Sequence, residues 1–255
     1  MMTDSDHASP VYLILGATGG IGSTLARRLA ARGARLALAA TTPEKLESLK
    51  DELPTETFSD AFDATEPAAV EAFAKSAKDH FGRLDGLANL VGSIVLKPAH
   101  TTSDEEFDRT LRLNLWTSFG ATRAAAKTMR SSGGSVVLMS TAAAEAGIAN
   151  HEAIAAAKAG VTGLGRSAAS TYATNSIRFN VVAPGLVNTP GAEGITKNEM
   201  ALKASAAMHA LGRIGEPEDV APLIDLLLSD DARWITGQVF GADGGLATLR
   251  TRVKV

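Results

Sequence analysis

A glycine-rich segment directly after a short apolar run is the feature that most constrains how this chain folds. Val11–Leu15 is apolar throughout, and Gly16-Ala-Thr-Gly-Gly-Ile-Gly22 follows it without a gap. A continuous apolar run that stops at glycine is typical of a strand buried on both faces. Apolar residues then recur every four positions over 20–32, and Gly33 follows. This pattern predicts a strand, a tight glycine turn and an amphipathic helix with a glycine cap.

The glycine turn has the chemistry of a phosphate-binding loop. Reversal from strand to helix needs positive φ, and a bound diphosphate needs a close backbone, so both favour glycine. The first turn of the next helix offers unpaired N–H groups and a partial positive charge to an anion. A tight turn without a ligand is the alternative for an isolated glycine cluster. Because this cluster follows the first buried strand of an alternating chain, it favours a dinucleotide site.

Short apolar runs alternate with longer amphipathic segments along the chain. Further strands are expected at 35–40, 57–63, 84–91, 135–140, 177–183 and 238–242. Helices are expected at 43–52, 66–80, 103–130, 151–173 and 216–229, with an irregular helical stretch at 192–209. Such alternation with right-handed crossovers implies a parallel sheet. The predicted fold class is α/β: a Rossmann-type, doubly wound, mostly parallel seven-stranded sheet with helices on both faces.

The alternation indicates one domain. Residues 1–10 are expected to form a flexible tail, and residues 11–255 a single Rossmann-fold domain. The stretch 184–194 is rich in proline and glycine. We interpret it as a long loop beside the ligand rather than a domain boundary, because the strand–helix pattern resumes after it.

Composition and charge exclude several classes of protein. With 45% hydrophobic and 21% charged residues, the chain resembles neither a disordered protein nor a coiled coil. A net charge of −3 argues against nucleic-acid binding, which usually needs a basic surplus. No apolar run reaches the roughly 18 residues of a membrane span, so no membrane contact is expected. The absence of cysteine excludes thiolate chemistry and fits a reducing cytoplasm, where we expect the protein.

Metal binding is not expected from the histidines. The pair His151-Glu152 starts the zinc-binding pattern His-Glu-x-x-His, but Ala155 stands at its fifth position. The other four histidines show no ligand spacing.

Taken together, these motifs resemble those of the short-chain dehydrogenase/reductase family, from Val11 to about Leu246. The glycine spacing is similar to the family's coenzyme motif, and 184–189, Pro-Gly-Leu-Val-Asn-Thr, to its nicotinamide loop. Asp63 in Phe62-Asp-Ala-Thr65 matches the family's adenine-contacting aspartate, and Asn89-Leu-Val-Gly92 matches its Asn-Asn-Ala-Gly motif without the second asparagine. Asn114 in Leu113-Asn-Leu115 matches the helix asparagine of its catalytic set, and Gly237 to Gly245 matches its closing Gly-x-x-x-x-x-Asp-Gly-Gly. Each motif alone is weak, and the combination is specific.

The resemblance implies an NAD(P)-dependent oxidoreductase that acts on a carbonyl or alcohol. The coenzyme contacts that it implies are Gly16, Thr18, Gly20, Ile21, Gly22, Thr41, Asp63, Asn89, Gly92, Lys158, Pro184, Gly185, Val187 and Thr189. It further implies a catalytic set with Asn114, Thr141 and Lys158. The stretch 192–209 is alanine-rich with scattered larger apolar residues, which favours a partly apolar small-molecule substrate.

Two catalytic positions depart from the family pattern, and one of them is the position of the acid/base. The resemblance implies Tyr-x-x-x-Lys with a serine thirteen residues before the tyrosine. Lys158 matches the lysine, but Ile154 stands at the tyrosine position and Thr141 at the serine position, after Ser140. A threonine hydroxyl still donates a hydrogen bond, whereas isoleucine neither gives nor takes a proton. Because general acid–base catalysis contributes roughly 10²–10⁴ to a rate, we expect a slow reductase unless another group substitutes.

His151 is the substitute that the spacing favours. It precedes Ile154 by three residues, and residues three apart on a helix are neighbours. An imidazole exchanges protons near neutral pH. The alternative is a solvent-facing residue at the start of the helix. Glu145 and His209 are interpreted as solvated surface residues, with a place at the mouth of the pocket as the alternative.

The end of the second strand decides which coenzyme fits. An acidic side chain there binds the adenosine ribose of NAD and repels the 2′-phosphate of NADP. Leu38-Ala-Ala-Thr-Thr42 has none, and the hydroxyls of Thr41 and Thr42 are available to a phosphate. Gly19 stands where many NADP-dependent members have arginine. The sequence favours NADP and leaves NAD open.

Small residues on two expected helices indicate close packing with another backbone. One group is Ala121-Thr-Arg-Ala-Ala-Ala126, and the other is Gly160, Gly163 and Gly165. Glycine inside a helix costs up to about 1 kcal/mol relative to alanine, so three of them need a reason. The resemblance implies a homodimer or homotetramer; packing against the chain's own sheet is the alternative.

Three functions remain open from the sequence. The first is a reductase or dehydrogenase with an altered proton donor, which Asn114, Thr141, Lys158 and Thr189 favour. The second is a catalytically inactive nucleotide-binding sensor or scaffold, which Ile154 favours. The third is a non-redox enzyme that uses the same pocket.

Overall fold

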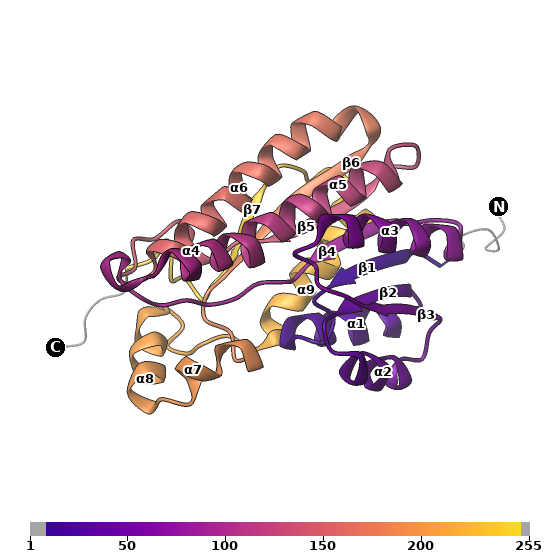
Figure 1. Ribbon diagram of the computed structural model, residues 1–255. Helices are drawn as coiled ribbons and strands as arrows, with labels where there is room; N and C mark the ends of the chain where they lie inside the picture. The colour runs from indigo at the N-terminus through magenta and orange to yellow at the C-terminus, as the bar shows by residue number, and fades with distance from the viewer. Residues whose placement is uncertain (1–8, 251–255) are drawn as a thin grey trace.

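Seven parallel strands form one sheet at the centre of the structure (Figure 1). In the computed structural model, which describes residues 9–250, these are β1 (Val11–Leu15), β2 (Arg35–Ala40), β3 (Thr57–Ala61), β4 (Gly86–Asn89), β5 (Gly134–Met139), β6 (Ile177–Pro184) and β7 (Val239–Ala242). Their order is β3-β2-β1-β4-β5-β6-β7, and every neighbouring pair is parallel. The predicted fold class is confirmed. Most of the expected tail, residues 1–8, lies outside the described residues.

Helices cover both faces of this sheet (Figure 1). One face carries α1 (Gly20–Ala31), α2 (Pro43–Glu52) and α9 (Pro217–Leu228); the other carries α3 (Pro67–Phe81), α5 (Thr117–Met129) and α6 (Glu152–Tyr172). Alternate residues of β1 serve two separate cores: Leu13 packs on the α3–α5–α6 side and Ile14 on the α1–α9 side. Because both faces are covered, the strand is apolar throughout, as the unbroken run in the sequence indicates.

The chain order reverses between β1 and β4, which lie side by side in the sheet. The crossovers after these two strands leave toward opposite faces, so the segments that follow β1 and β4 diverge and leave a crevice between them. Doubly wound sheets bind ligands at this switch point. The glycine turn after β1 and the loop after β4 therefore form opposite walls of the candidate site.

The helix expected at 103–130 is interrupted at Asn114. After α4 (Asp104–Leu111), a π-helical turn spans Arg112–Trp116, and α5 follows. In a π turn the backbone bonds reach one residue further than in an α-helix, and such turns are frequent at functional sites. Asn114 Nδ2 donates to the Thr110 carbonyl at 3.0 Å, so the side chain supplies an additional donor at the widened turn. The expectation of one regular helix is wrong at this point.

The small residues of the two long helices pack inside the chain. The alanines of 121–126 are buried. A Cβ on Gly165 would lie 2.5 Å from Val181 Cγ2, and one on Gly160 would lie 2.9 Å from Leu115 Cδ2, whereas the third glycine of the group has open space. The close packing is therefore real, but its partners are the chain's own sheet and the π turn. Packing within the chain, the alternative given from the sequence, therefore holds for Gly160 and Gly165, and the expected homodimer or homotetramer stays a prediction.

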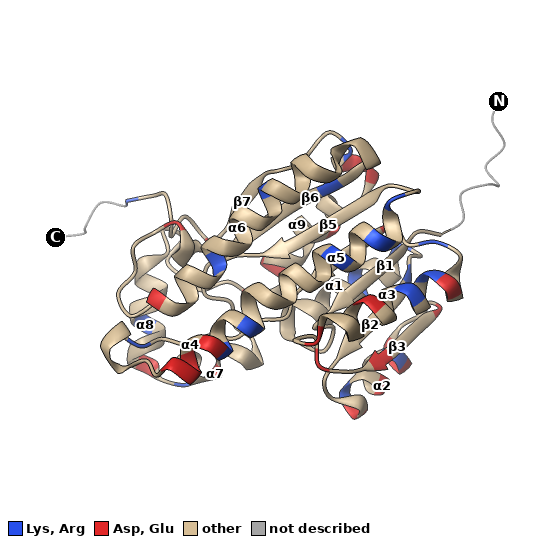
Figure 2. Ribbon diagram, turned by 45° about the horizontal axis from the view of Figure 1, so that its top comes forward, with Lys and Arg blue, Asp and Glu red and all other residues tan. Residues whose placement is uncertain are grey.

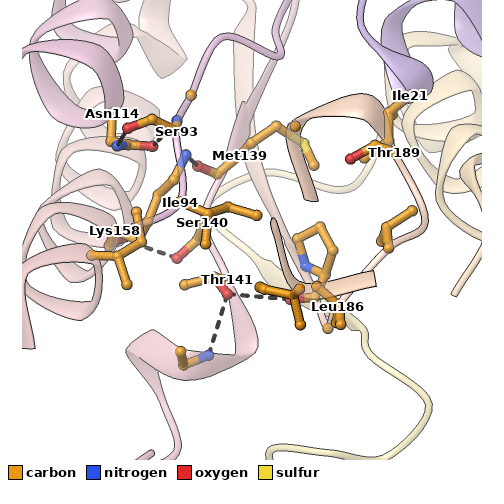
Figure 3. A pocket seen from close by; sticks show the side chains of 18 of the residues that line it. Ile21, Ser93, Ile94, Asn114, Met139, Ser140, Thr141, Lys158, Leu186 and Thr189 are labelled. Atoms are coloured by element: carbon orange, nitrogen blue, oxygen red, sulfur yellow. Dashed lines mark hydrogen bonds between the residues drawn. The ribbon is translucent and has the colours of Figure 1, made fainter. Parts of the chain in front are cut away.

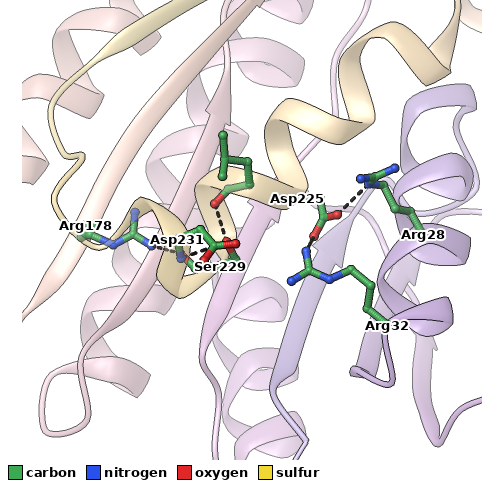
Figure 4. Close-up of polar contacts among 7 residues, drawn as sticks. Arg28, Arg32, Arg178, Asp225, Ser229 and Asp231 are labelled. Atoms are coloured by element: carbon green, nitrogen blue, oxygen red, sulfur yellow. Dashed lines mark hydrogen bonds and ion pairs between the residues drawn. The ribbon is translucent and has the colours of Figure 1, made fainter.

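A buried carboxylate fastens α1 to α9 (Figure 4). The Asp225 side chain is 2% exposed and accepts a hydrogen bond from Arg28 Nε at 2.6 Å and another from Arg32. Arg28 lies in the second half of α1 and Arg32 directly follows its last residue, and both side chains are half-exposed. Arg178 of β6 makes a second link, donating to the Ser229 carbonyl at 3.0 Å. These contacts hold α1 against the sheet and so position its N-terminal turn at the crevice.

Charged side chains of both signs are distributed over the outer helices, and β1, β4 and β5 carry none (Figure 2). Their absence from these strands follows from the helix layers on both faces, since a charge there would be buried without a partner. None of the helices within residues 9–250 combines the length and the apolar character needed to cross a membrane.

Candidate active site

A pocket of about 330 Å³ lies at the carboxyl ends of the strands. Its walls come from the segments that follow four strands: 16–22 after β1, 90–96 after β4, 139–143 at the end of β5, and 184–191 after β6. Residues of α6 form its floor, and residues of α7 (Glu193–Thr196) and α8 (Glu199–Met208) lie over it. Figure 3 shows Asn114 and Lys158 on one side of the pocket and Ile21 and Thr189 on the other.

The glycine turn has the geometry that a phosphate cradle needs. Gly16 has φ of +77°, which side chains rarely allow. A Cβ on Gly22 would collide with the Gly16 carbonyl oxygen. The N-cap residue of α1, Gly19, provides no side-chain cap, so the first N–H groups of this helix have no side-chain partner where the helix meets the pocket. The residues present therefore fit the diphosphate of a dinucleotide.

Asn114 holds the loop after β4 in place. It is fully buried, its Nδ2 donates to Ser93 Oγ at 3.1 Å, and its Oδ1 accepts from the Ser93 N–H at 3.2 Å (Figure 3). A Cβ on Gly92 would lie 2.8 Å from Asn114 Oδ1 and 3.3 Å from Lys158 Nζ. Gly92 therefore brings Asn114 and Lys158 close to the same stretch of backbone.

Lys158 is a buried cation without an anionic partner. Its residue is 7% exposed, and Nζ donates to the Met139 carbonyl at 2.9 Å. Among the described residues, no carboxylate pairs with it. Desolvation of the ammonium lowers the pKa of Lys158 from 10.5 to about 8. Since an ammonium has three N–H donors, Lys158 has donors left for hydroxyl groups of a ligand.

The neighbouring hydroxyls of Ser140 and Thr141 differ in availability. Ser140 is buried, donates to the Lys158 carbonyl at 3.0 Å and accepts from Thr162 Oγ1 at 3.2 Å, so it fastens β5 to α6. Thr141 Oγ1 makes two long contacts of 3.4 Å, with the Pro184 carbonyl and the Ala143 N–H (Figure 3). Long bonds are weak, so the Thr141 hydroxyl is the one that a ligand in the pocket can recruit.

His151 and Ile154 both line the pocket. His151 is the residue before α6, and its Nδ1 lies 2.8 Å from the Ala149 carbonyl oxygen. Because a carbonyl only accepts, Nδ1 carries a proton, and the neutral ring presents a lone pair at Nε2. Ile154 is 5% exposed. The structure thus brings Asn114, Thr141, His151 and Lys158 together around one pocket.

Most of the predicted coenzyme residues also line this pocket: Gly16, Gly20, Ile21, Gly22, Gly92, Lys158, Pro184, Gly185, Val187 and Thr189. Thr18, Thr41, Asp63 and Asn89 do not. Asn89 is buried, and its Nδ2 donates to Ser118 Oγ at 3.1 Å, so it holds β4 against α5 instead of facing the pocket. Thr18 lies in a surface hollow between the starts of α1 and α2, beside Lys45.

His209 is buried, so its interpretation as a solvated surface residue is wrong. It is 4% exposed and lines the pocket from the end of α8. Its Nδ1 lies 2.7 Å from the Ser205 carbonyl oxygen, and its Nε2 accepts from the Leu186 N–H at 3.2 Å. Gly185, which makes room for the ring, is distant from His209 in the sequence, so no local pattern indicates its burial.

Two further residues of the site escape sequence reasoning. Ser93 is the partner of Asn114, and the Met139 carbonyl is the partner of Lys158. The only sequence signal for Ser93 is its position directly after Gly92 at the end of a strand. Met139 contributes its backbone carbonyl oxygen, and because every residue has one, the residue type gives no signal for this role.

Aliphatic side chains from several elements form much of the pocket lining, and we call them the apolar wall. They include Ile94, Leu96, Ile148, Ile154, Ile195, Met208 and Leu246. The lining, as far as residues 9–250 provide it, includes no aspartate, glutamate or arginine. This wall therefore suits a neutral, apolar ligand, since a buried anion would have only Lys158 to pair with.

Comparison with known proteins identifies the family. A family model described as enoyl-(acyl carrier protein) reductase matches residues 16–247. The short-chain dehydrogenase/reductase aba4 of Botryotinia fuckeliana (strain B05.10) is 35% identical, over 96% of this chain and 99% of that protein. The chain is a short-chain dehydrogenase/reductase. Its relatives include the levodione reductase of Leifsonia aquatica, which is 34% identical over 92% of this chain and 93% of that protein.

Solved structures of short-chain dehydrogenase/reductases have the same fold. The crystal structure of levodione reductase superposes with a TM-score of 0.88, at 34% identity, over 94% of this chain and 98% of that one. A point variant of actinorhodin polyketide ketoreductase, solved with NADPH, superposes with a TM-score of 0.87, at 26% identity, over 94% of this chain and 98% of that one. These likenesses cover the whole sheet and its helices, and they place this short-chain dehydrogenase/reductase among oxidoreductases.

Proposed function

We propose that this short-chain dehydrogenase/reductase reduces the carbonyl group of a neutral, largely apolar small molecule, with NADPH preferred over NADH and without a tyrosine acid. The observation that carries the proposal is the convergence of Asn114, Thr141, His151 and Lys158 on the pocket that also contains the glycine turn. A nicotinamide coenzyme, when bound, supplies the hydride for such a reduction. The aliphatic wall supports the substrate class.

Separate groups of this chain are assigned to bind the diphosphate, the ribose and the nicotinamide end of the coenzyme. The first N–H groups of α1 suit the diphosphate, and the Lys158 ammonium suits ribose hydroxyls. The loop with Thr189 closes the nicotinamide end. NADPH is favoured because β2 ends without an acidic residue that would repel a 2′-phosphate. The NADPH of actinorhodin ketoreductase supports the same choice.

We assign proton transfer to His151 Nε2. The Ala149 carbonyl holds Nδ1–H in either protonation state, so the exchangeable proton of the ring is the one at Nε2. In its protonated form, Nε2–H donates to the substrate oxygen as negative charge develops there. Thr141 Oγ1 donates a hydrogen bond to the same oxygen, and the Lys158 charge stabilises it. Ile154 excludes water beside these groups.

A coenzyme and substrate panel tests the function. Reduction of neutral cyclic and aryl ketones, followed by loss of nicotinamide absorbance, is expected with NADPH at a kcat/KM at least about tenfold above that with NADH, given one added phosphate contact. Carboxylated analogues of the same ketones are expected to react more slowly. Coenzyme binding without turnover of any ketone would instead identify a sensor or scaffold. Absence of coenzyme binding would refute the whole proposal.

Removal of His151 tests the proton donor. We expect His151→Ala to lower kcat about 100-fold with little change in KM, because acid catalysis is lost while the apolar wall stays. The Tm is expected to stay within about 2 °C, since the ring makes one exposed bond. His100→Ala, at an exposed histidine outside the pocket, is the matched control. An unchanged kcat in His151→Ala would remove His151 from the mechanism.

A further inference from the structure

His209 connects the helix over the pocket with the loop beside it. Its ring spans from the Ser205 carbonyl in α8, 2.7 Å from Nδ1, to the Leu186 N–H after β6, 3.2 Å from Nε2. A Cβ on Gly185 would collide with Nε2, so glycine is what lets the ring reach the backbone here. The proposed mechanism makes no use of this buried, titratable group.

The two partners dictate the protonation state of the ring. The Ser205 carbonyl only accepts, so Nδ1 carries a proton; the Leu186 N–H only donates, so Nε2 carries a lone pair. The ring is therefore neutral in this arrangement. A second proton, at Nε2, would face the Leu186 N–H, and two donors cannot bond to each other. Protonation of His209 thus removes one of the two bonds that it makes.

The bond to Leu186 acts directly on the pocket wall. The Leu186 peptide is held on both sides, since its carbonyl accepts from the Gly215 N–H at 2.8 Å. Leu186, Ser205 and Met208 all line the pocket. Apart from this histidine, α8 contributes no fully buried side chain that would fix it, because none of its own ten residues is buried. Loss of the Leu186 bond is therefore expected to loosen the helix that covers the substrate, whose C-terminal end keeps the bond from the Leu211 N–H to the Gly244 carbonyl at 3.1 Å.

The charged groups around His209 offer its protonated form no partner. On the turn after β7, Asp243 Oδ1 accepts a hydrogen bond from the Gly245 N–H at 2.9 Å, and Oδ2 accepts one from the Ala247 N–H at 2.8 Å. On the same side, Arg213 and Asp219 pair with each other. Lys158 and His151 line the same pocket as His209. Within residues 9–250, no carboxylate forms an ion pair with His209.

We propose that His209 is a positioning residue: in its neutral form it ties α8 to the loop at Leu186 and closes the apolar wall, and its protonation releases α8. The consequence for substrate binding rests on the proposed function. The two hydrogen bonds that His209 makes, to Leu186 and to Ser205, do not depend on the proposed function, because they belong to the folded chain without a substrate.

A protease experiment tests the tie without any substrate. Trypsin cuts after lysine, and Lys197 and Lys203 are accessible in the α7–α8 segment. At about pH 8, His209→Ala is expected to be cut there about five to ten times faster than the wild type, which corresponds to one lost hydrogen bond. His209→Gln is expected to be cut at nearly the wild-type rate, because its amide oxygen accepts from Leu186 N–H. His100→Ala is the control. Equal rates in His209→Ala and the wild type would overturn the proposal.

The pH dependence tests the protonation step. On acidification the wild-type KM for a ketone is expected to rise about five- to tenfold once a second proton on His209 removes the bond to Leu186. In His209→Gln the rise is expected to vanish, because glutamine takes no proton. The pH profile of kcat is expected to be the same in both, since His151 and Lys158 are intact. An identical KM profile in His209→Gln and the wild type would refute the switch, even if the protease result supports the tie.

Discussion

Replacing Lys158 by methionine is expected to lower kcat/KM for carbonyl reduction about 10²–10³-fold, the cost typical of removing one preorganised electrostatic contact. Lys158 is the one lysine among the described residues that line the pocket, and it forms no ion pair with a carboxylate there. Its Nζ donates to the Met139 carbonyl and lies close to Gly92. Methionine has a similar length and no charge. We expect both coenzyme affinity and kcat to fall, since the same ammonium suits ribose hydroxyls and the substrate oxygen.

The same substitution is expected to stabilise the fold. Desolvation lowers the pKa of Lys158 from 10.5 to about 8, so below pH 8 the folded chain holds a buried charge that costs about 3 kcal/mol. The unfolded chain binds the proton more tightly, so the free energy of unfolding of the wild type rises with pH from about 8 to about 10.5. Lys158→Met removes that cost, so its Tm near neutral pH is expected to exceed that of the wild type, and its stability loses this pH dependence.

The measurements for Lys158 are kcat/KM, coenzyme affinity by fluorescence titration, and Tm at several pH values. Lys75→Met is the control, because the Lys75 side chain is 75% exposed on α3 and far from the lining. Wild-type activity is also expected to decline as the pH rises through about 8, when the ammonium loses its charge. A variant with normal kcat/KM, or one with lower activity and a lower Tm, would show that Lys158 is structural.

Much of the fold is predictable because it depends on local patterns. The apolar runs and the glycine caps predict the order of strands and helices, and β1 and β2 match their expected bounds. The third and fourth strands are shorter than expected, ending at Ala61 and Asn89, since the pairing with neighbouring strands stops there. Strand ends depend on partners, which a single sequence does not reveal.

The features that sequence reasoning misses all depend on contacts between distant segments. The π turn at Asn114 accompanies side-chain bonds to Ser93, on another loop. The burial of His209 needs a glycine at position 185, on a distant segment. The packing of Gly165 against Val181 places the partner of the small residues inside the chain. In each case the residue type is informative, and only the tertiary structure says what it contacts.

Replacing Ile154 by tyrosine is expected to raise kcat/KM for a neutral ketone about 100-fold, the largest gain that a single substitution offers here. Ile154 lines the pocket one helical turn before Lys158, and residues four apart on a helix are neighbours. A phenol at this position reaches into the cavity with Thr141, His151 and Lys158. The nearby ammonium favours the phenolate, so the phenol becomes a better acid, and acid catalysis is worth roughly 10²–10⁴.

Ile154→Phe separates the hydroxyl from the ring. It adds the same bulk to the pocket without an ionisable group, so kcat/KM is expected to stay at or below the wild-type value. If both variants gain activity equally, the effect is one of packing. If Ile154→Tyr gains nothing while its Tm and coenzyme affinity match those of the wild type, the pocket no longer accepts a proton donor at position 154, and the proposed mechanism is wrong about where the substrate oxygen lies.

A double-mutant cycle connects this gain to His151. If His151 is the proton donor of the wild type, a tyrosine at position 154 replaces it, and the two substitutions are not additive. His151→Ala is therefore expected to cost about 100-fold in the wild type but less than about twofold in Ile154→Tyr. Equal losses in both backgrounds would mean that His151 acts on something other than the substrate oxygen. The cycle thus tests the proton donor by comparing the loss caused by His151→Ala in two backgrounds. Differences in expression or stability between single variants would lower the rate by the same factor in both backgrounds and so would not produce this difference.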